Sequence, residues 1–217
     1  MRHLLYHELL DALDGSACPV CTLAARAVDG FLRSFLYEGV NDVGLRARLR
    51  TAGGFCHPHA WQLQRLGDPL AHALLYQDLV DDRLSRPGAF APSPAPGPDR
   101  CPACGLAADA AHRYLSGLVE ALADPAFRAR YEGAFGLCLP HLARALDLPR
   151  LPGPVRDFLL DCARRQGQRL REQLAEIIRK SDYRHAHEPR GPEKDAWVRA
   201  VRWWVGGRDL PPTRPGS

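Results

Sequence analysis

The sequence predicts an all-α protein built from a duplicated helical repeat. Apolar residues recur every three to four positions along most of the chain, which is the spacing of one face of an amphipathic helix. Alternating runs of β-branched residues, which are typical of strands, do not stand out. A cysteine and histidine pattern also occurs twice, and duplication of this kind decides the architecture of a fold.

The similarity between the two copies extends beyond their cysteines. Cys18-Pro-Val-Cys21 and the residues after it align with Cys101-Pro-Ala-Cys104 and its successors. Residues 45–59 then align with residues 127–141, including Gly54 and Gly136 ahead of a cysteine. We infer an internal duplication of four-helix repeats, each expected to be organised around one Cys3His metal site.

Helices are expected wherever the apolar stripe persists between breaks such as Gly53-Gly54 and Gly67-Asp68-Pro69. In the first repeat they cover residues 19–37, 44–52, 58–66 and 69–85, and in the second they cover 102–123, 125–134, 139–147 and 154–181.

The sequence divides into four segments. Residues 1–85 hold the first repeat and 101–182 the second, while five prolines between them indicate an extended linker over 86–100. The tail, 183–217, contains a short helix at about 193–205 with Trp197, Val201, Trp204 and Val205 on one face. We expect Trp197 and Trp204 to pack this helix against the rest of the protein.

Composition indicates a globular protein without membrane insertion. The chain has 217 residues, 46% of them hydrophobic, and a net charge of +4 with the charges interspersed. Neither a continuous apolar segment typical of a signal peptide nor one of membrane-spanning length is apparent. A cytoplasmic location is therefore expected, where clustered thiols serve metal or redox chemistry rather than structural disulfides.

Eight residues have the types and spacing of metal ligands. Three thiolates and one imidazole satisfy the tetrahedral preference of zinc, so two zinc ions per chain are expected. Prolines 19, 58, 102 and 140 mark first-turn positions, so each ion would join two helix N-termini. We expect each repeat to form its own site: the first is Cys18, Cys21, Cys56 and His59, and the second is Cys101, Cys104, Cys138 and His141.

Other interpretations of the same residues stay open. An iron–sulfur cluster can use cysteine-rich ligand sets, and a Cys-x-x-Cys pair at a helix start suits thiol–disulfide chemistry. Binding of nucleic acid through arginine-rich helix faces is possible on charge but is not indicated by any basic block. Closed four-ligand sites favour a non-enzymatic module that acts through another protein, although the sequence does not decide whether the chain is an enzyme.

Three further residues have side chains that could take part in chemistry. His185 and His187 lie in a polar loop near Glu188, but we do not expect these two histidines and the carboxylate to form a metal site. The seventh cysteine, Cys162, lies on the apolar stripe of its helix and is expected to be a small core residue.

The combined motifs resemble a prokaryotic family of unknown function over nearly the whole chain. The resemblance implies that the eight cysteine and histidine positions are the signature of that family, and it implies no activity. The residues that carry it are Cys18-Pro-Val-Cys21, Gly54-Phe-Cys56-His-Pro-His59-Ala-Trp61, Cys101-Pro-Ala-Cys104, Gly136-Leu-Cys138-Leu-Pro-His141, and the tail segment Ile178-Arg-Lys-Ser-Asp-Tyr-Arg with Glu188-Pro.

Overall fold

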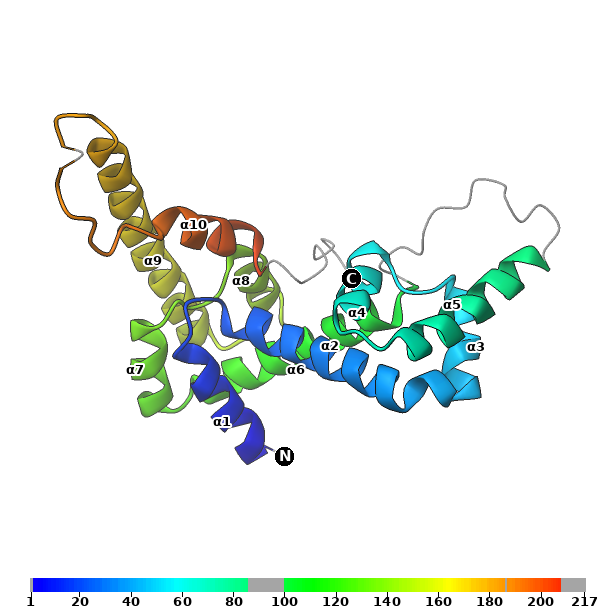
Figure 1. Ribbon diagram of the computed structural model, residues 1–217. Helices are drawn as coiled ribbons and strands as arrows, with labels where there is room; N and C mark the ends of the chain where they lie inside the picture. The colour runs from blue at the N-terminus through cyan, green and yellow to red at the C-terminus, as the bar shows by residue number, and fades with distance from the viewer. Residues whose placement is uncertain (1, 86–99, 186, 208–217) are drawn as a thin grey trace. The chain divides into compact units, whose positions relative to one another are not determined.

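The structure, a computed structural model, describes residues 2–85, 100–185 and 187–207, and these are helical with no strand among them (Figure 1). The predicted all-α class is therefore confirmed. Except for Arg100, the predicted proline-rich linker lies outside the described residues. The helices are α1 (Arg2–Leu13), α2 (Pro19–Tyr37), η1 (Gly39–Asn41), α3 (Val43–Ala52), α4 (His57–Arg65), α5 (Pro69–Leu84), α6 (Pro102–Ala121), α7 (Pro125–Gly133), α8 (Leu139–Leu146), α9 (Gly153–Lys180) and α10 (Ala196–Val205).

The two repeats fold in the same local way. Asp42 caps the N-terminus of α3 by accepting the N–H of Leu45, and Asp124 caps α7 by accepting that of Ala126. Further on, Gly54 and Gly136 adopt φ values of 94° and 72°, in the left-handed region that favours glycine. The duplication in the sequence is therefore matched by equivalent caps and turns.

The chain divides into two compact units that do not coincide with the sequence repeats. Unit 1 contains Met1–Leu23 and Ala111–Ser217, and unit 2 contains Ala24–Ala110. The chain passes from one unit to the other inside α2 and returns inside α6. Each unit is therefore assembled from parts of both repeats.

Unit 1 has a leucine-rich core that also contains aromatic rings. The helix α1, which precedes the first helix predicted from the sequence, packs against α7 (Figure 1). Tyr6 of α1 lies over Phe127 of α7, with 5.4 Å between the ring centroids. The side chains of this core that are buried almost completely are Leu9, Leu115, Leu118, Leu122, Phe127 and Leu159.

Unit 2 is organised around the C-terminal half of α2, with α3 packed against α5 and η1. Phe35 of α2 meets Phe55 edge-on, at 5.4 Å between the ring centroids. Phe55 directly precedes Cys56, so this contact fixes the chain just before α4 begins. The core of the unit also contains Leu32, Leu49, Leu63 and Leu75.

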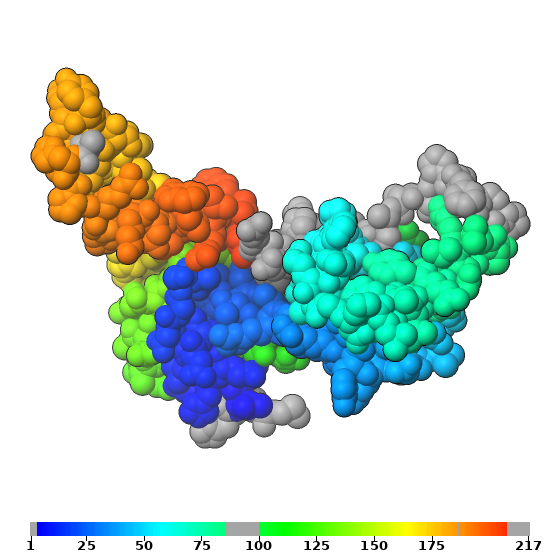
Figure 2. All heavy atoms as spheres, viewed as in Figure 1, coloured from blue at the N-terminus to red at the C-terminus, as the bar shows by residue number. Residues whose placement is uncertain are grey.

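The helix α10 packs on α8 and α9 through a different face from the one expected. Trp197 and Trp204 are 63% and 67% exposed, so the prediction that they dock the helix is wrong. Trp203 takes that role, because its ring lies against Gly167 of α9. Figure 2 shows α10 at the surface of unit 1, with the end of α9 and the loop after it projecting from the same unit.

Candidate metal centres

The eight predicted residues gather into two buried groups. Site A consists of Cys18, Cys21, Cys138 and His141, and lies in unit 1. Site B consists of Cys56, His59, Cys101 and Cys104, and lies in unit 2. In each group the potential ligand atoms all lie within 4.8 Å of one another.

The grouping by repeat is wrong, because each site takes two residues from each repeat. Cys18 and Cys21 of the first repeat meet Cys138 and His141 of the second, and the exchange is reciprocal at site B. This exchange of residues between the repeats follows from the path of the chain. The residues after the Cys-x-x-Cys start of α2 enter unit 2, and those after the equivalent start of α6 enter unit 1.

Both sites join the N-termini of two helices, as predicted. At site A these helices are α2 and α8, and at site B they are α4 and α6. Cys138 and Cys56 are the N-cap residues of α8 and α4, with nearly identical backbone angles: φ −68° and ψ 159° for Cys138, and φ −65° and ψ 163° for Cys56. The unpaired N–H groups and the positive end of the helix dipole at such termini favour thiolate over thiol.

The spacing of the donors fits one tetrahedral ion per site. Zinc–ligand distances of about 2.3 Å to sulfur and 2.0–2.1 Å to nitrogen give tetrahedral edges of about 3.8 Å between sulfurs and about 3.6 Å between sulfur and nitrogen. At site A, Cys21 Sγ lies 3.7 Å from Cys138 Sγ. At site B, the equivalent distance from Cys56 Sγ to Cys104 Sγ is 3.5 Å.

The histidines face the sulfurs through Nδ1. His141 Nδ1 lies 3.5, 3.3 and 3.2 Å from the sulfurs of Cys18, Cys21 and Cys138. At site B, His59 Nδ1 lies 3.2 Å from Cys56 Sγ, 3.6 Å from Cys101 Sγ and 3.3 Å from Cys104 Sγ. Nδ1 is therefore the atom that would bind an ion, which places the proton of each neutral ring on Nε2.

Each site already favours one thiolate. Burial raises the pKa of Cys18, but hydrogen bonds with Cys138, Cys21 and His141 outweigh it and hold that pKa well below its usual value. At site B a hydrogen bond with Cys104 lowers the pKa of Cys101 to about 3. These two residues are the first cysteines of the two Cys-x-x-Cys motifs.

The remaining thiols resist ionisation. A hydrogen bond with Cys138 lowers the pKa of Cys21, but the Cys18 thiolate and burial raise it to about 12. The pKa of Cys138 is raised by its hydrogen bonds with Cys18 and Cys21. Since like charges oppose one another in a buried space, three thiolates at one site need a cation among them.

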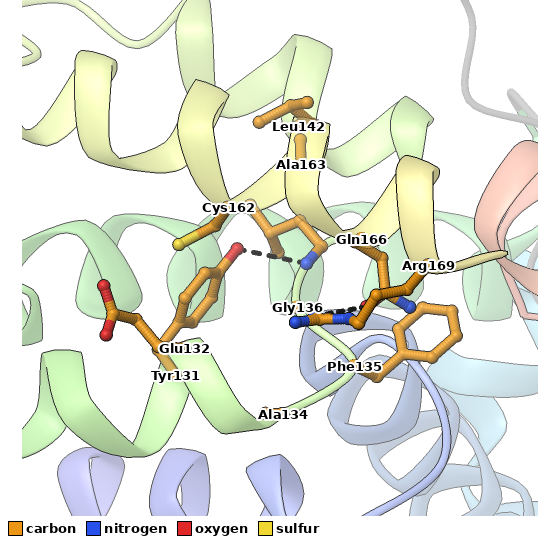
Figure 3. A pocket seen from close by; sticks show the side chains of 11 residues that line it. Tyr131, Glu132, Ala134, Phe135, Gly136, Leu142, Cys162, Ala163, Gln166 and Arg169 are labelled. Atoms are coloured by element: carbon orange, nitrogen blue, oxygen red, sulfur yellow. Dashed lines mark hydrogen bonds between the residues drawn. The ribbon is translucent and has the colours of Figure 1, made fainter. Parts of the chain in front are cut away.

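Tyr131 of α7 supports the approach to Cys138 in the second repeat. Its hydroxyl accepts the N–H of Leu137 at 3.1 Å, beside the turn at Gly136 (Figure 3). Burial raises the pKa of Tyr131, so the phenol stays neutral. This contact could not be predicted from the repeat, because the position equivalent to Tyr131 in the first copy is Leu49.

The residues beyond the two sites form no comparable group. Cys162 is partly exposed beside the pocket in Figure 3, and its sulfur accepts a hydrogen bond from Arg165 at 3.2 Å. His185 Nδ1 pairs with Glu188 at 2.9 Å. Neither His187 nor Cys162 joins a cluster of three potential ligands within the described part of the chain. In that part, moreover, no helix is both long enough and apolar enough to cross a membrane.

Comparison with known proteins agrees with the resemblance in the sequence. The chain is 31% identical over 194 residues to a protein of Caldicellulosiruptor sp. (strain Rt8B.4) named "Uncharacterized 23.9 kDa protein in xynA 3'region", covering 87% of this chain and 95% of that protein. No solved structure matches. Residues 97–210, which include half of each site, match the family described as "Family of unknown function (DUF6062)". The chain therefore belongs to that family of unknown function, DUF6062.

Proposed function

We propose that this protein binds two Zn²⁺ ions, one at site A and one at site B, and that the ions are structural. The observation that carries the proposal is the convergence of three sulfurs and one imidazole nitrogen on one point in each unit. Every ligand residue is at most 4% exposed. Four protein ligands complete the coordination of zinc, which leaves no open position for a substrate and argues against catalysis at the metal.

The same geometry favours a single ion over a cluster. Each iron of an iron–sulfur cluster takes its own protein ligands, so ligand atoms are spread around the cluster rather than converging on one point. Atoms within 4.8 Å of one another fit the edges of a single tetrahedron better. Thiol–disulfide exchange also needs an accessible sulfur, which the burial of these cysteines opposes.

Elemental analysis of the purified chain, combined with its absorption spectrum, tests the identity of the metal. We expect a colourless protein with two zinc ions per chain, and a brown protein containing iron and sulfide would contradict the proposal. Removal of both ions by a strong chelator should unfold much of the helical structure, because folding and metal binding are coupled in closed sites. Unchanged circular dichroism after complete removal would show that the ions are not structural.

We further propose that the protein acts by contacting another protein through the outer face of α10. Trp197, Val201, Trp204 and Val205 are each at least 59% exposed and follow one side of the helix. Contiguous apolar patches of this kind are typical of interaction sites. A photoreactive amino acid at position 204 should give a defined covalent adduct in cells. The same group at Tyr37, which is 82% exposed in unit 2, should not.

A further inference from the structure

The end of α10 closes against site A. The helix stops at Gly206, which is buried and has a φ of 90°, a conformation that side chains rarely adopt. This turn directs the next N–H group inward, and Gly207 N donates to Cys21 Sγ at 3.2 Å. The backbone of the tail thus makes direct contact with a candidate ligand atom.

A side chain is disfavoured at both glycines, by the positive φ at Gly206 and by crowding at Gly207. A Cβ atom at Gly206 would lie 3.6 Å from Cys21 Sγ and 3.7 Å from Cys138 Sγ. At Gly207 it would lie 3.1 Å from Cys21 Cβ, which is tighter than ordinary van der Waals contact. Two successive glycines therefore allow the chain to pass over both sulfurs.

The rest of α10 holds this turn in place through contacts with the two chain segments that form site A. Arg202 donates to the hydroxyl of Ser16 at 3.2 Å, just ahead of Cys18. The helix also packs on α8, which carries Cys138 and His141. Both chain segments that form site A are therefore in contact with α10.

Site B differs in this respect. Within the described ranges, the sulfurs of Cys56, Cys101 and Cys104 have hydrogen-bond partners only among the residues of site B itself. The two groups share ligand types, helix caps and burial. Among the described residues, the Gly206-Gly207 turn thus supplies a donor to a ligand sulfur of site A that has no counterpart at site B.

We propose that the Gly206-Gly207 turn is an outer clamp on site A, which slows loss of the ion there relative to site B and couples docking of α10 to occupancy of site A. An N–H donor aimed at a thiolate stabilises its charge and so keeps it bound to the cation. Linkage is reciprocal, so an ion that holds Cys21 as a thiolate stabilises the docked tail in turn. The inference rests on the proposed binding of two zinc ions.

Transfer of zinc to a chromophoric chelator tests the clamp on the full chain. The wild type should release its two ions in two phases of equal amplitude. Gly206→Ala should accelerate only the slower phase, by about 10- to 100-fold, the usual effect of losing an outer hydrogen-bond partner. The matched control is Gly67→Ala in unit 2, where φ is 89° but nothing lies within 4 Å of an added Cβ. It should leave both phases unchanged.

The same transfer reports on the docking of α10 by fluorescence. Four tryptophans occur in the chain, so Trp61→Phe leaves only those of α10. In that background the emission should change with the slower phase. Emission that changes with the faster phase would overturn the coupling.

The remaining outcomes separate the two proposals. A Gly206→Ala chain that holds two zinc ions and releases both at wild-type rates overturns the clamp but leaves the proposed function intact. A wild-type chain that holds no zinc overturns both. If Gly206→Ala does not fold, the clamp is tested on the wild type instead. The protein is loaded with a magnetically active cadmium isotope and studied by nuclear magnetic resonance. The Gly207 amide should show scalar coupling to one cadmium, and no coupling at a resolved amide would overturn the clamp.

Discussion

Cys18 Sγ lies 3.5 Å from His141 Nδ1, although the two residues are 123 positions apart in the sequence. An ion bound between them would tie the N-terminal segment of unit 1 to α8. At site B the separation from His59 to Cys101 is 42 positions, so the ion there closes a shorter loop. Bound ions would therefore connect segments that lie far apart in the sequence, at both sites.

The pairing across repeats can be tested by thiol reactivity. Cys18→Ala should release the site A ion and leave Cys21 and Cys138 open to alkylation, while Cys56 of site B stays protected. Mass spectrometry of the alkylated protein would identify the modified residues. Cys162→Ala, outside both sites, serves as the control and should leave all six ligand cysteines protected. Joint exposure of Cys21 and Cys56 would instead support grouping by repeat.

The eight candidate ligands could be picked out from the sequence, but the way they group in space could not. Both repeats provide a Cys-x-x-Cys helix start and a Cys-x-x-His helix start, so either grouping satisfies the spacing of the motifs. Cys56 and Cys138 even share their backbone angles, which leaves nothing local to distinguish them. The choice depends on where α2 and α6 lead the chain, which is a property of the whole fold.

The docking face of α10 was mispredicted for a related reason. Its apolar residues gather on the side opposite Arg199 and Arg202, so hydrophobic periodicity points to the face that the structure leaves exposed. Trp203 packs on α9 because Gly167, which has no side chain, leaves space for its ring. Gly206-Gly207 is a familiar signal for the end of a helix, but its contact with a sulfur depends on packing between distant segments.

Zinc binding should release about two protons per ion at neutral pH. Cys18 and Cys101 have lowered pKa values and are thiolates before the ion arrives, whereas the other four ligand thiols have raised pKa values and must lose protons. Affinity should therefore rise with pH and fall on acidification, as protons compete for the sulfurs. Calorimetric titration in buffers of different ionisation enthalpy measures the number directly. Release of three protons per ion would show that no thiolate is preformed.

Tyr131→Phe should destabilise the zinc-loaded protein by about 1–3 kcal/mol, because the buried N–H of Leu137 loses its acceptor. Unfolding by denaturant, followed by circular dichroism, measures the change in the free energy of unfolding. The matched control is Tyr183→Phe, whose side chain is 86% exposed and which should change stability little. Equal effects of the two substitutions would show that the hydroxyl of Tyr131 does not hold the turn before Cys138.

Glycine substitutions inside two helices should have opposite effects on stability. Gly117 of α6 lies against α1, and an added Cβ would fall 2.0 Å from Leu5 Cδ2 and 3.1 Å from its Cγ. Gly117→Ala should therefore destabilise the protein by about 1–3 kcal/mol, as overpacking of a core usually does. At Gly30 of α2 nothing lies within 4 Å of an added Cβ. Gly30→Ala should stabilise by up to about 1 kcal/mol, because alanine favours the helix.

Denaturant unfolding of both variants with zinc bound measures this difference. The sign of the Gly117 effect decides whether α1 packs as closely on α6 as the structure shows, because without that contact Gly117→Ala would gain helix stability as Gly30→Ala does. Close packing there has a consequence for the metal. The packing of α1 helps to anchor the segment that leads into Cys18, so Gly117→Ala should also speed release of the site A ion while leaving site B unchanged.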